Sequence, residues 1–356
     1  MKHFPVSNSN LSASHLGLYL SEKYALAPTM HCRIIRAGVN DTYLADDGIN
    51  KYVFRVYSLN WRTEKEISAE IGFLNLLREK NIPISYPITD KYGRMIQTLP
   101  APEGDRFGVL FSYARGEKLH SISADMNYQI GVVMGKLHAV TRDLPFGRVV
   151  YTPDILLAEP MEQIKKFLAT DTAEWAFMES ARDCITDQLV KAEHTELRQG
   201  GVHLDIWFDN LNISKEGEIT LFDFDFCGNG LLALDPAYYI LQLHNIERDE
   251  QERVLKVAHF LRGYESVTPL SDEERRLIPM LGICIYFFYL GVQCRRYDNW
   301  SNSFLSEDYL KRFINTLIKK YYNLYKLGEP GAEHAPSFPK EINEEEDHQH
   351  DNGGNQ

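Results

Sequence analysis

The segment 203–223 places the strongest constraint on what this chain can fold into. It begins His-Leu-Asp-Ile-Trp-Phe-Asp-Asn, and an apolar run over 219–222 then ends at Asp223, thirteen residues after Asn210. A short apolar run bounded by polar residues is typical of a buried strand. The spacing therefore predicts two adjoining loops that bring Asp205, Asn210 and Asp223 to one place.

These three side chains have the chemistry that phosphate transfer requires. That reaction needs the accepting hydroxyl held in line with the γ-phosphate, a carboxylate to take its proton, and oxygen ligands for Mg²⁺. Asp205 fits the carboxylate role, while Asn210 and Asp223 supply hard oxygen ligands. His203 is expected to orient the loop by hydrogen bonds rather than react. Asp and Asn are also ordinary turn residues, so the strand that delivers Asp223 is what makes the pattern specific.

The regions on either side of this segment differ in their predicted secondary structure. Ahead of it the sequence predicts a helix at 12–27, strands at 32–36, 42–45 and 52–57, a helix at 63–78, a weak hairpin at 91–93 and a strand at 107–113. Further helices are predicted at 126–140, within 153–197 and within 237–327, and strand-like pieces at 212–214 and 218–222. The order of these elements indicates an α+β fold in two lobes.

We expect three parts in the chain. Residues 1–112 form a small β-rich nucleotide-binding lobe with a leading helix, and residues 113–328 form a large, mainly helical lobe that carries the catalytic loop, the metal site and the acceptor pocket. Residues 329–356 hold eight acidic residues and one lysine, a net charge of −7 out of the chain's −12. Polar, acidic composition of this kind predicts a disordered tail.

Composition and charge exclude several classes of partner. With a net charge of −12 the chain has no basic footprint for nucleic acid, and a cationic substrate would suit it better. The N-terminus lacks the apolar stretch of a signal peptide, and the most apolar segment, 281–294, is too short to span a bilayer. It predicts a buried helix, and no membrane partner is expected.

The cysteines favour a reducing compartment. The five are scattered and form no C-x-x-C pair: Cys32, Cys184, Cys227, Cys284 and Cys294. This arrangement argues against a disulfide framework or a zinc site and predicts a cytoplasmic protein.

The chain resembles the aminoglycoside phosphotransferase and choline kinase superfamily, which has a protein-kinase-like fold. The resemblance covers about residues 30–325 and is strongest over HLDIWFDN and ITLFDFDFCGNGLLALDPAYY. It implies that Asp205 is the catalytic base and that Asn210 and Asp223 are the Mg²⁺ ligands. Asp235, in Asp-Pro-Ala, matches the aspartate that supports the catalytic loop from below.

The resemblance also implies a nucleotide site in the first lobe. A turn over the phosphates and a linker whose backbone bonds the adenine edge would contribute Gly38, Asn40, Thr42, Ser112 and Ala114. Arg55 occupies the third-strand position of the phosphate-binding lysine, although a strand arginine is otherwise most often exposed. Glu70 is its expected ion-pair partner, with Glu66 as the alternative. The implied cofactors are ATP and Mg²⁺, and GTP is not excluded.

Three residues of the central segment depart from the family pattern. Leu204 stands where the pattern H-G-D has glycine, and a branched side chain demands ordinary backbone angles. We therefore expect an altered loop or a partly closed acceptor site. Asp209 and Asp225 add carboxylates that either touch Mg²⁺ or a cationic acceptor, or serve as solvated or capping groups.

Three functions are compatible with these residues. The first is a kinase that phosphorylates a hydroxyl of a small molecule: an amino sugar, an amino alcohol or a hydroxy amino acid such as homoserine. The second is a Ser/Thr protein kinase of the bacterial stress-response type, and the third is a pseudokinase that binds nucleotide without turnover. The presence of the base and both metal ligands argues against the third.

The C-terminal helices are similar to the stress-response kinase and type II homoserine kinase branches. The similarity lies in the segments 260–264, 285–289 and 295–298, whose aromatic residues are mostly expected in the core. Arg295, Arg296 and Asp298 either line an acceptor cleft or end a helix favourably.

The acceptor itself cannot be identified from the sequence. Acidic residues at Asp154, Glu159 and Glu162 would suit a cationic acceptor, although charge on a helix more often marks a solvated face. The oligomeric state is equally open.

Overall fold

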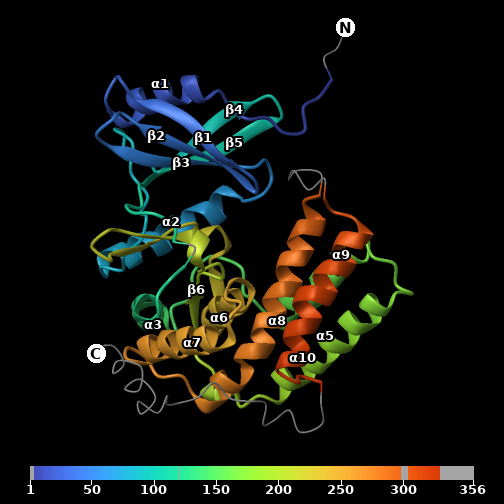
Figure 1. The fold of residues 1–356 in the computed structure, drawn as a ribbon. Helices are drawn as coiled ribbons and strands as arrows, with labels where there is room; N and C mark the ends of the chain where they lie inside the picture. The colour runs from blue at the N-terminus through green and yellow to red at the C-terminus, as the bar shows by residue number, and fades with distance from the viewer. Residues whose placement is uncertain (1–3, 120, 298–303, 329–356) are drawn as a thin grey trace, which may run out of the picture.

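A five-stranded antiparallel sheet forms the N-terminal part of the computed structural model, which describes residues 4–119, 121–297 and 304–328. The elements in chain order are α1 (Ala13–Tyr24), β1 (His31–Ala37), β2 (Asn40–Asp46), β3 (Lys51–Tyr57), α2 (Glu64–Glu79), β4 (Ile96–Ala101) and β5 (Gly104–Ser112). The strand order is β1-β2-β3-β5-β4, so β3 lies at the centre (Figure 1).

Alternation along the strands decides what each face of the sheet contacts. Phe54 and Leu110 point to the side of α1 and share a core cluster with Leu16 and Leu20. Val109 and Phe111, on either side of Leu110, belong instead to the second, larger core cluster, which also contains the buried face of α2. Because side chains alternate with a period of two, Arg55 must point to the α2 side, between the sheet and the rest of the molecule.

The sequence at the start of α2 fixes where this helix begins. The Thr63 side chain accepts a hydrogen bond from the Glu66 amide, and the Glu66 side chain accepts one from the Thr63 amide. This reciprocal pair satisfies two amides that the first turn would otherwise leave without partners. One face of α2 then buries Ile67, Ile71 and Leu74.

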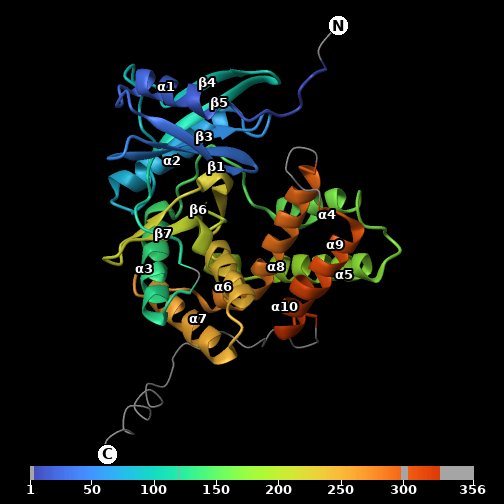
Figure 2. The same ribbon diagram turned by 45° about the horizontal axis from the view of Figure 1, so that its top comes forward.

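The remainder of the chain is mostly helical. Its elements are α3 (Ala124–Thr141), α4 (Glu159–Ile164), α5 (Ala173–Lys191), β6 (Gln199–Val202), β7 (Leu211–Ile213), β8 (Ile219–Leu221), β9 (Gly228–Leu231), α6 (Leu234–Ile246), α7 (Glu250–Glu265), α8 (Asp272–Arg295), α9 (Glu307–Phe313) and α10 (Lys319–Leu324). Short π-helical turns over Asp154–Ala158 and Ile314–Ile318 precede α4 and α10. Figure 2 shows α8 beside α4, α5, α9 and α10, with α6 between α8 and α3, and α7 packs against α3.

Helix α8 is the central helix of this part. It has 24 residues, begins at a capping box between Ser271 and Glu274, and contains Pro279. By length and composition alone it could cross a membrane, but 83% of its apolar window is buried inside the protein. The sequence predicted a buried helix over 281–294, which the structure confirms.

Most predicted elements are present, and the exceptions have local causes. A turn does occur at 91–93, held by the Asp90 side chain, but the predicted hairpin there is wrong. The hairpin partner of β5 is β4, which begins after that turn. The connection between the first two strands is shorter than the predicted strands at 32–36 and 42–45 imply, because β2 already begins at Asn40. Asp298 and the predicted acidic tail lie outside the described residues.

Candidate active site

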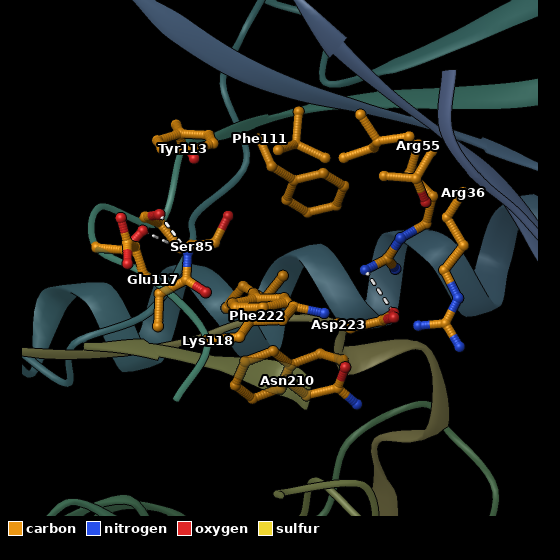
Figure 3. A pocket seen from close by; sticks show the side chains of 18 residues that line it. Arg36, Arg55, Ser85, Phe111, Tyr113, Glu117, Lys118, Asn210, Phe222 and Asp223 are labelled. Carbon is orange, nitrogen blue, oxygen red and sulfur yellow. Dashed lines mark hydrogen bonds and ion pairs between the residues drawn. The ribbon is translucent and has the colours of Figure 1, made fainter. Parts of the chain in front are cut away.

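A cavity of about 420 Å³ lies between the sheet and the helical part of the chain. In Figure 3, Phe111 and Tyr113 lie on the sheet side of this cavity, and Phe222 and Asn210 lie opposite them. Arg55 and Asp223 meet at one end. The cavity therefore has an apolar slot between aromatic rings and a charged end, which suits a ligand with a flat base and an anionic group.

Arg55 is held at this end by a buried ion-pair network. Its Nη1 lies 2.7 Å from Glu70 Oε1, and its Nη2 lies 3.1 Å from Asp223 Oδ1. The Tyr57 hydroxyl donates to Glu70 Oε2 at 3.0 Å. Burial acts to lower the pKa of Arg55, but the charges of Glu70, Tyr57, Asp223 and Asp225 together outweigh it and the pKa rises. The partner of Arg55 is thus Glu70, while Glu66 caps α2.

The loop between β6 and β7 carries Asp205 and Asn210 toward Asp223. The Asn210 amide donates to Asp205 Oδ2 at 2.7 Å and to the Asp205 carbonyl at 3.0 Å. Burial, and then the negative charge of Asp223, raises the pKa of Asp205 to about 8. Hydrogen bonds from Tyr238, Tyr289 and Asn210 act in the opposite direction by stabilising the carboxylate.

Asp223 lies two residues beyond the end of β8 and takes an unusual backbone conformation. Its φ and ψ are 66° and 58°, in the left-handed region that Asp tolerates better than most residues. Its side chain is 38% exposed, since it opens into the cavity. The sequence placed it at the end of a buried strand, and β8 ends two residues earlier at Leu221.

His203 is buried between the two loops. Its Nε2 lies 3.1 Å from the Phe222 carbonyl oxygen, and its Nδ1 accepts a hydrogen bond from the Asp205 amide at 3.2 Å. The ring therefore connects the Asp205 loop to the residue before Asp223. Burial lowers the pKa of His203, which favours the neutral ring that these two bonds require.

Asp235, on the first turn of α6, supports the Asp205 loop from beneath. Its carboxylate accepts hydrogen bonds from the His203 amide at 2.9 Å and the Leu204 amide at 2.6 Å. His138 Nε2 on α3 lies 3.0 Å from the same carboxylate, and Tyr264 on α7 contacts the other ring nitrogen at 2.8 Å. Residues from three helices thus fix the backbone on the N-terminal side of Asp205.

Leu204 does not have the ordinary backbone angles that we expected. Its φ is +66°, in the left-handed region, so the expectation of a normal conformation is wrong. The bond from its amide to Asp235 and the bond from Tyr289 to its carbonyl hold it there. Its side chain is fully buried in the core and lines neither cavity of the site, so it does not close the acceptor side.

Leu204→Gly is expected to destabilise the protein even though glycine suits this backbone better. Relief of the left-handed conformation is worth roughly 1–2 kcal/mol. Loss of a fully buried leucine side chain costs roughly 2–5 kcal/mol, so the net loss should be about 1–3 kcal/mol. Urea denaturation measures it, with the exposed Leu144→Gly as a control for general glycine effects. A more stable Leu204→Gly variant would show that strain outweighs packing here.

A second cavity of about 350 Å³ lies on the other side of Asp205 and Asp223. Its wall includes several aromatic and amide side chains from the C-terminal helices: Tyr238, Gln242, Asn245, Tyr286, Tyr289 and Gln293. The two cavities share five lining residues, namely Arg36, Thr42, Arg55, Asn210 and Asp223. Two ligands in these cavities would therefore meet at Asn210, Asp223 and Arg55.

Some of the residues predicted for the site lie elsewhere. In the part of the chain that the structure describes, neither Gly38 nor Ser112 lines these two cavities, whereas Asn40 and Thr42 line the second and Ala114 the first. The Ser112 amide donates to the Tyr86 carbonyl at 2.9 Å, and the Ser112 carbonyl accepts from the Ser85 hydroxyl at 2.5 Å. These backbone groups already have partners within the protein.

The candidate acceptor residues on the large lobe are also absent from the second cavity. Asp154, Glu159 and Glu162 are exposed and line none of it. Arg295 and Arg296 line a different cavity, near the loop after β3. Charge on these helices was therefore no guide to the acceptor side.

Asp225 and Asp209 both have ion-pair partners, and Asp225 also lines the second cavity. Asp225 is buried, and its carboxylate accepts hydrogen bonds from Trp61 Nε1 at 2.7 Å and Arg62 Nε at 3.2 Å. Burial acts to raise the pKa of Asp225, but nearby arginines, Arg62 foremost, outweigh it and lower the pKa to about 2. Asp209 lies 3.3 Å from Lys118 Nζ. Asp225 is thus neither solvated nor a cap.

Arg36 is the main site residue that the sequence reasoning missed. Strand pairing places Arg36 beside Thr42 and Thr42 beside Arg55, so the three form one row across β1, β2 and β3. Figure 3 shows Arg36 close to Arg55 and Asp223. The register of the three predicted strands was the available signal, but a bulge between Ile34 and Arg36 shifts that register by one residue.

The donor groups around Asp223 fit a divalent cation that binds together with a phosphate. Among the described residues, no group of three or more His, Cys, Asp or Glu side chains could hold a metal ion by itself. Asp223 and Asn210 offer carboxylate and amide oxygens, and both line both cavities. Mg²⁺ usually binds through one or two protein oxygens plus phosphate oxygens, which is the arrangement available here.

Comparison with known proteins gives a consistent family assignment. A family model described as "Phosphotransferase enzyme family" matches residues 31–270, more than half of the chain. A protein from Deinococcus radiodurans is 29% identical over 89% of this chain and 92% of its own length. A homoserine kinase from Mesorhizobium japonicum is 26% identical over 77% of this chain and 82% of its own length.

Solved structures with the same fold agree with this assignment. An amicoumacin kinase in complex with AMP-PNP, Ca²⁺ and amicoumacin superposes with a TM-score of 0.71 at 19% identity, covering 86% of this chain and 93% of that one. A microcompartment-associated aminopropanol kinase has a TM-score of 0.71 at 20% identity, covering 88% and 98%. At these identities the likeness establishes the kinase-like fold.

Proposed function

The chain belongs to the phosphotransferase enzyme family, and on that premise we propose that it transfers the γ-phosphate of ATP to a hydroxyl of a small molecule. The observation that carries the proposal is that Asn210 and Asp223 line both cavities, while Asp205 lines the second beside them. One cavity takes the nucleotide and the other the acceptor. The reacting groups then meet at the shared wall.

The nucleotide would bind in the cavity between the sheet and the helical part. The base fits between Phe111 and Phe222, and the phosphates extend toward Arg55 and Arg36. Arg55 is fixed by Glu70, so it is already oriented before the nucleotide binds. A pre-oriented guanidinium loses little freedom when it pairs with phosphate, which favours tight binding.

Mg²⁺ would be held by Asn210 and Asp223 together with the phosphates. When bound, the ion neutralises charge that develops on the transferring phosphate. The Asn210 amide nitrogen is engaged with Asp205, so its amide oxygen is directed away from that carboxylate. One oxygen of Asp223 pairs with Arg55, which leaves the other for the cation.

Asp205 would accept the proton of the acceptor hydroxyl. The same side chain lines the second cavity and accepts a hydrogen bond from Asn210, so base and metal ligand are fixed relative to each other. The charge of Asp223 is one cause of the raised pKa of Asp205, so a cation held at Asp223 would lower that pKa and favour the carboxylate form that a general base requires. His203 and Asp235 position this loop by the bonds described above.

The second cavity favours a small acceptor with an amino group. Its volume of about 350 Å³ lies in the range of small-ligand sites rather than an open groove for a protein segment. On α6 and α8 its lining residues are aromatic or amide side chains without a lysine or arginine. Aromatic faces and carboxylates attract ammonium groups, whereas a carboxylate on the acceptor would find a cation only at Arg36 or Arg55. We therefore favour an amino alcohol or amino sugar over a hydroxy amino acid.

A panel of acceptors tests the proposal. We expect transfer of ³²P from ATP to at least one of the aminoglycosides, choline, aminopropanol and ethanolamine, with weaker or no transfer to homoserine and none to casein. Transfer to casein alone would favour the protein-kinase alternative. Binding of Mg·ATP without transfer to any acceptor or to water would favour the pseudokinase. The free thiols are compatible with a reducing cytoplasm, where we propose that the enzyme works.

A further inference from the structure

A basic cavity of about 510 Å³ lies away from the nucleotide cavity, between the loop after β3 and the end of α8. Its wall includes Arg62, Arg295 and Arg296, with Trp61 among them. A smaller cavity of about 220 Å³ also has Trp61, Arg62 and Arg295 in its wall. We propose that the larger cavity binds the phosphate group of a small phosphomonoester. This site is separate from the proposed transfer reaction and does not depend on it.

Three guanidinium groups gather around one indole ring in this cavity. Those of Arg62 and Arg296 lie 4.5 Å from the Trp61 ring centroid, and that of Arg295 lies at 5.4 Å. Each gains a cation–π contact, but three like charges so close together repel one another. Burial, and then the charge of Arg62, lowers the pKa of Arg295. In a chain whose net charge is −12, such a cluster indicates a place for an anion.

The carboxylates nearby are already engaged. Asp225 holds Arg62 through Nε and also accepts from Trp61. Glu66 accepts from the Thr63 amide and hydroxyl, each at 2.8 Å, as part of the cap of α2, and lies 4.0 Å from Arg62. These two negative charges leave the cluster of three arginines with a positive excess.

Arg295 is the member of the cluster with the most open position. Its side chain is exposed, and no carboxylate in residues 4–119, 121–297 or 304–328 forms an ion pair with it. Glu159 acts on it only through the electrostatic field. Arg295 could therefore turn its guanidinium group to a ligand at the cost of its cation–π contact with Trp61.

The chemistry of the wall selects phosphate esters. A guanidinium presents a planar pair of N–H donors that match two phosphate oxygens, and Arg is the residue most suited to this bidentate contact. Asn60 adds an amide group to the same wall, whereas the Ser58 hydroxyl already donates to the Val39 carbonyl at 2.6 Å. A volume of about 510 Å³ exceeds what one phosphate ion needs, so room remains for a small organic group.

A ligand here would connect two parts of the molecule. Arg296 already donates to the Val39 carbonyl at 3.1 Å, in the turn between β1 and β2. Arg62 is bonded to Asp225, two residues beyond Asp223. A phosphate that binds Arg62, Arg295 and Arg296 would therefore tie the end of α8 to the sheet and stabilise the folded protein.

The test uses the full chain saturated with Mg²⁺ and a non-hydrolysable ATP analogue, so that Arg36 and Arg55 are covered. Glycerol 3-phosphate is titrated by calorimetry and thermal unfolding, with uncharged glycerol and chloride of matched ionic strength as references. We expect binding and a rise in Tm with glycerol 3-phosphate only. Arg295→Gln should weaken the binding about tenfold or more, since it removes a charge-assisted contact. Arg248→Gln, an exposed arginine in the α6–α7 loop, should bind like the wild type.

Further measurements decide whether the ligand is a phosphate ester or free phosphate, and whether the cavity binds phosphate at all. Inorganic phosphate that binds as tightly as the ester would support the same site with the free ion as its ligand. No binding of either probe to the wild type, or equal binding to Arg295→Gln, would overturn the proposal. Should Arg295→Gln unfold, Arg295→Lys replaces it in the test. Lysine keeps the positive charge but lacks the paired N–H donors of a guanidinium. Unchanged affinity in Arg295→Lys would also overturn the proposal. Binding is measured without turnover, so the measured affinity for the phosphate probe does not depend on whether the protein catalyses the transfer reaction.

Discussion

Asp205→Asn is expected to lower the rate of phosphate transfer by about 10²–10⁴-fold, the range typical of a general base. The affinity for Mg·ATP should stay within about twofold, because the substitution leaves the nucleotide cavity intact. The asparagine oxygen can still accept the Asn210 amide bond that now measures 2.7 Å, so the loop should keep its geometry. Initial rates with a saturating acceptor measure the first effect, and calorimetry measures the second.

Asp209→Asn is the matched control for Asp205→Asn. It makes the same chemical change four residues further along the same loop, where the carboxylate pairs with Lys118 at 3.3 Å. Its transfer rate should remain close to that of the wild type. Should Asp209→Asn lose as much activity as Asp205→Asn, or should Asp205→Asn keep full activity, Asp205 would not be the base.

Asp223→Asn is expected to weaken Mg²⁺-dependent binding of ATP by about 10- to 100-fold. That loss corresponds to one charge-assisted contact of roughly 1.5–3 kcal/mol. Asparagine is the suitable replacement because the φ of this residue is +66°, a conformation that Asn tolerates and most residues do not. The change then removes a charge without adding backbone strain. Calorimetry with a non-hydrolysable ATP analogue at fixed Mg²⁺ gives the affinity.

An arm with EDTA separates the metal role of Asp223 from its contact with Arg55. Without Mg²⁺ the wild type should bind the nucleotide weakly, and Asp223→Asn should bind it no more weakly than that. Removal of a carboxylate 3.1 Å from Arg55 even frees that guanidinium for phosphate. Equal Mg·ATP affinity in wild type and variant would contradict the metal role.

The chemistry-bearing core of the site was predictable because its members are local in sequence. Asp205 and Asn210 lie on one loop, and Asp223 follows a strand with an unambiguous apolar run. The pairing of Arg55 with Glu70 was implied by the family resemblance, and the two side chains do pair at 2.7 Å. Periodicity over a few residues predicts only the strand and the helix that carry them.

The paired strands β6 and β9 could not be predicted from local sequence patterns. These strands read Gln-Gly-Gly-Val and Gly-Asn-Gly-Leu, with little propensity for strand. Glycine is present for packing instead: a side chain at Gly200 would come within 2.5 Å of the Thr141 carbonyl oxygen. That neighbour lies 59 residues earlier, on α3. Its approach cannot be read from the local pattern.

Leu204 and the acceptor cavity were unpredictable for the same physical reason. The left-handed conformation of Leu204 is imposed by Asp235 and Tyr289, which lie 31 and 85 residues away in the chain. The second cavity is built from helix faces where Gln242 and Gln293 interrupt apolar surroundings. In one sequence such amides look like ordinary polar positions of a helix.

The two walls of the acceptor cavity have different consequences for evolution. The wall shared with the nucleotide cavity comes from the strands and the Asp205–Asp223 segment, where we expect substitutions to disturb the proposed transfer. The opposite wall comes from α6, α8 and the turn before α10, and it contains Gln242 and Tyr286, which both form a hydrogen bond with Asn245. Within the described residues neither of these two side chains forms a hydrogen bond to the Asp205 loop, so we expect substitutions there to exchange one acceptor for another while the proposed reacting groups stay in place. The acceptor specificity can therefore change by substitutions that keep the enzyme active at each step.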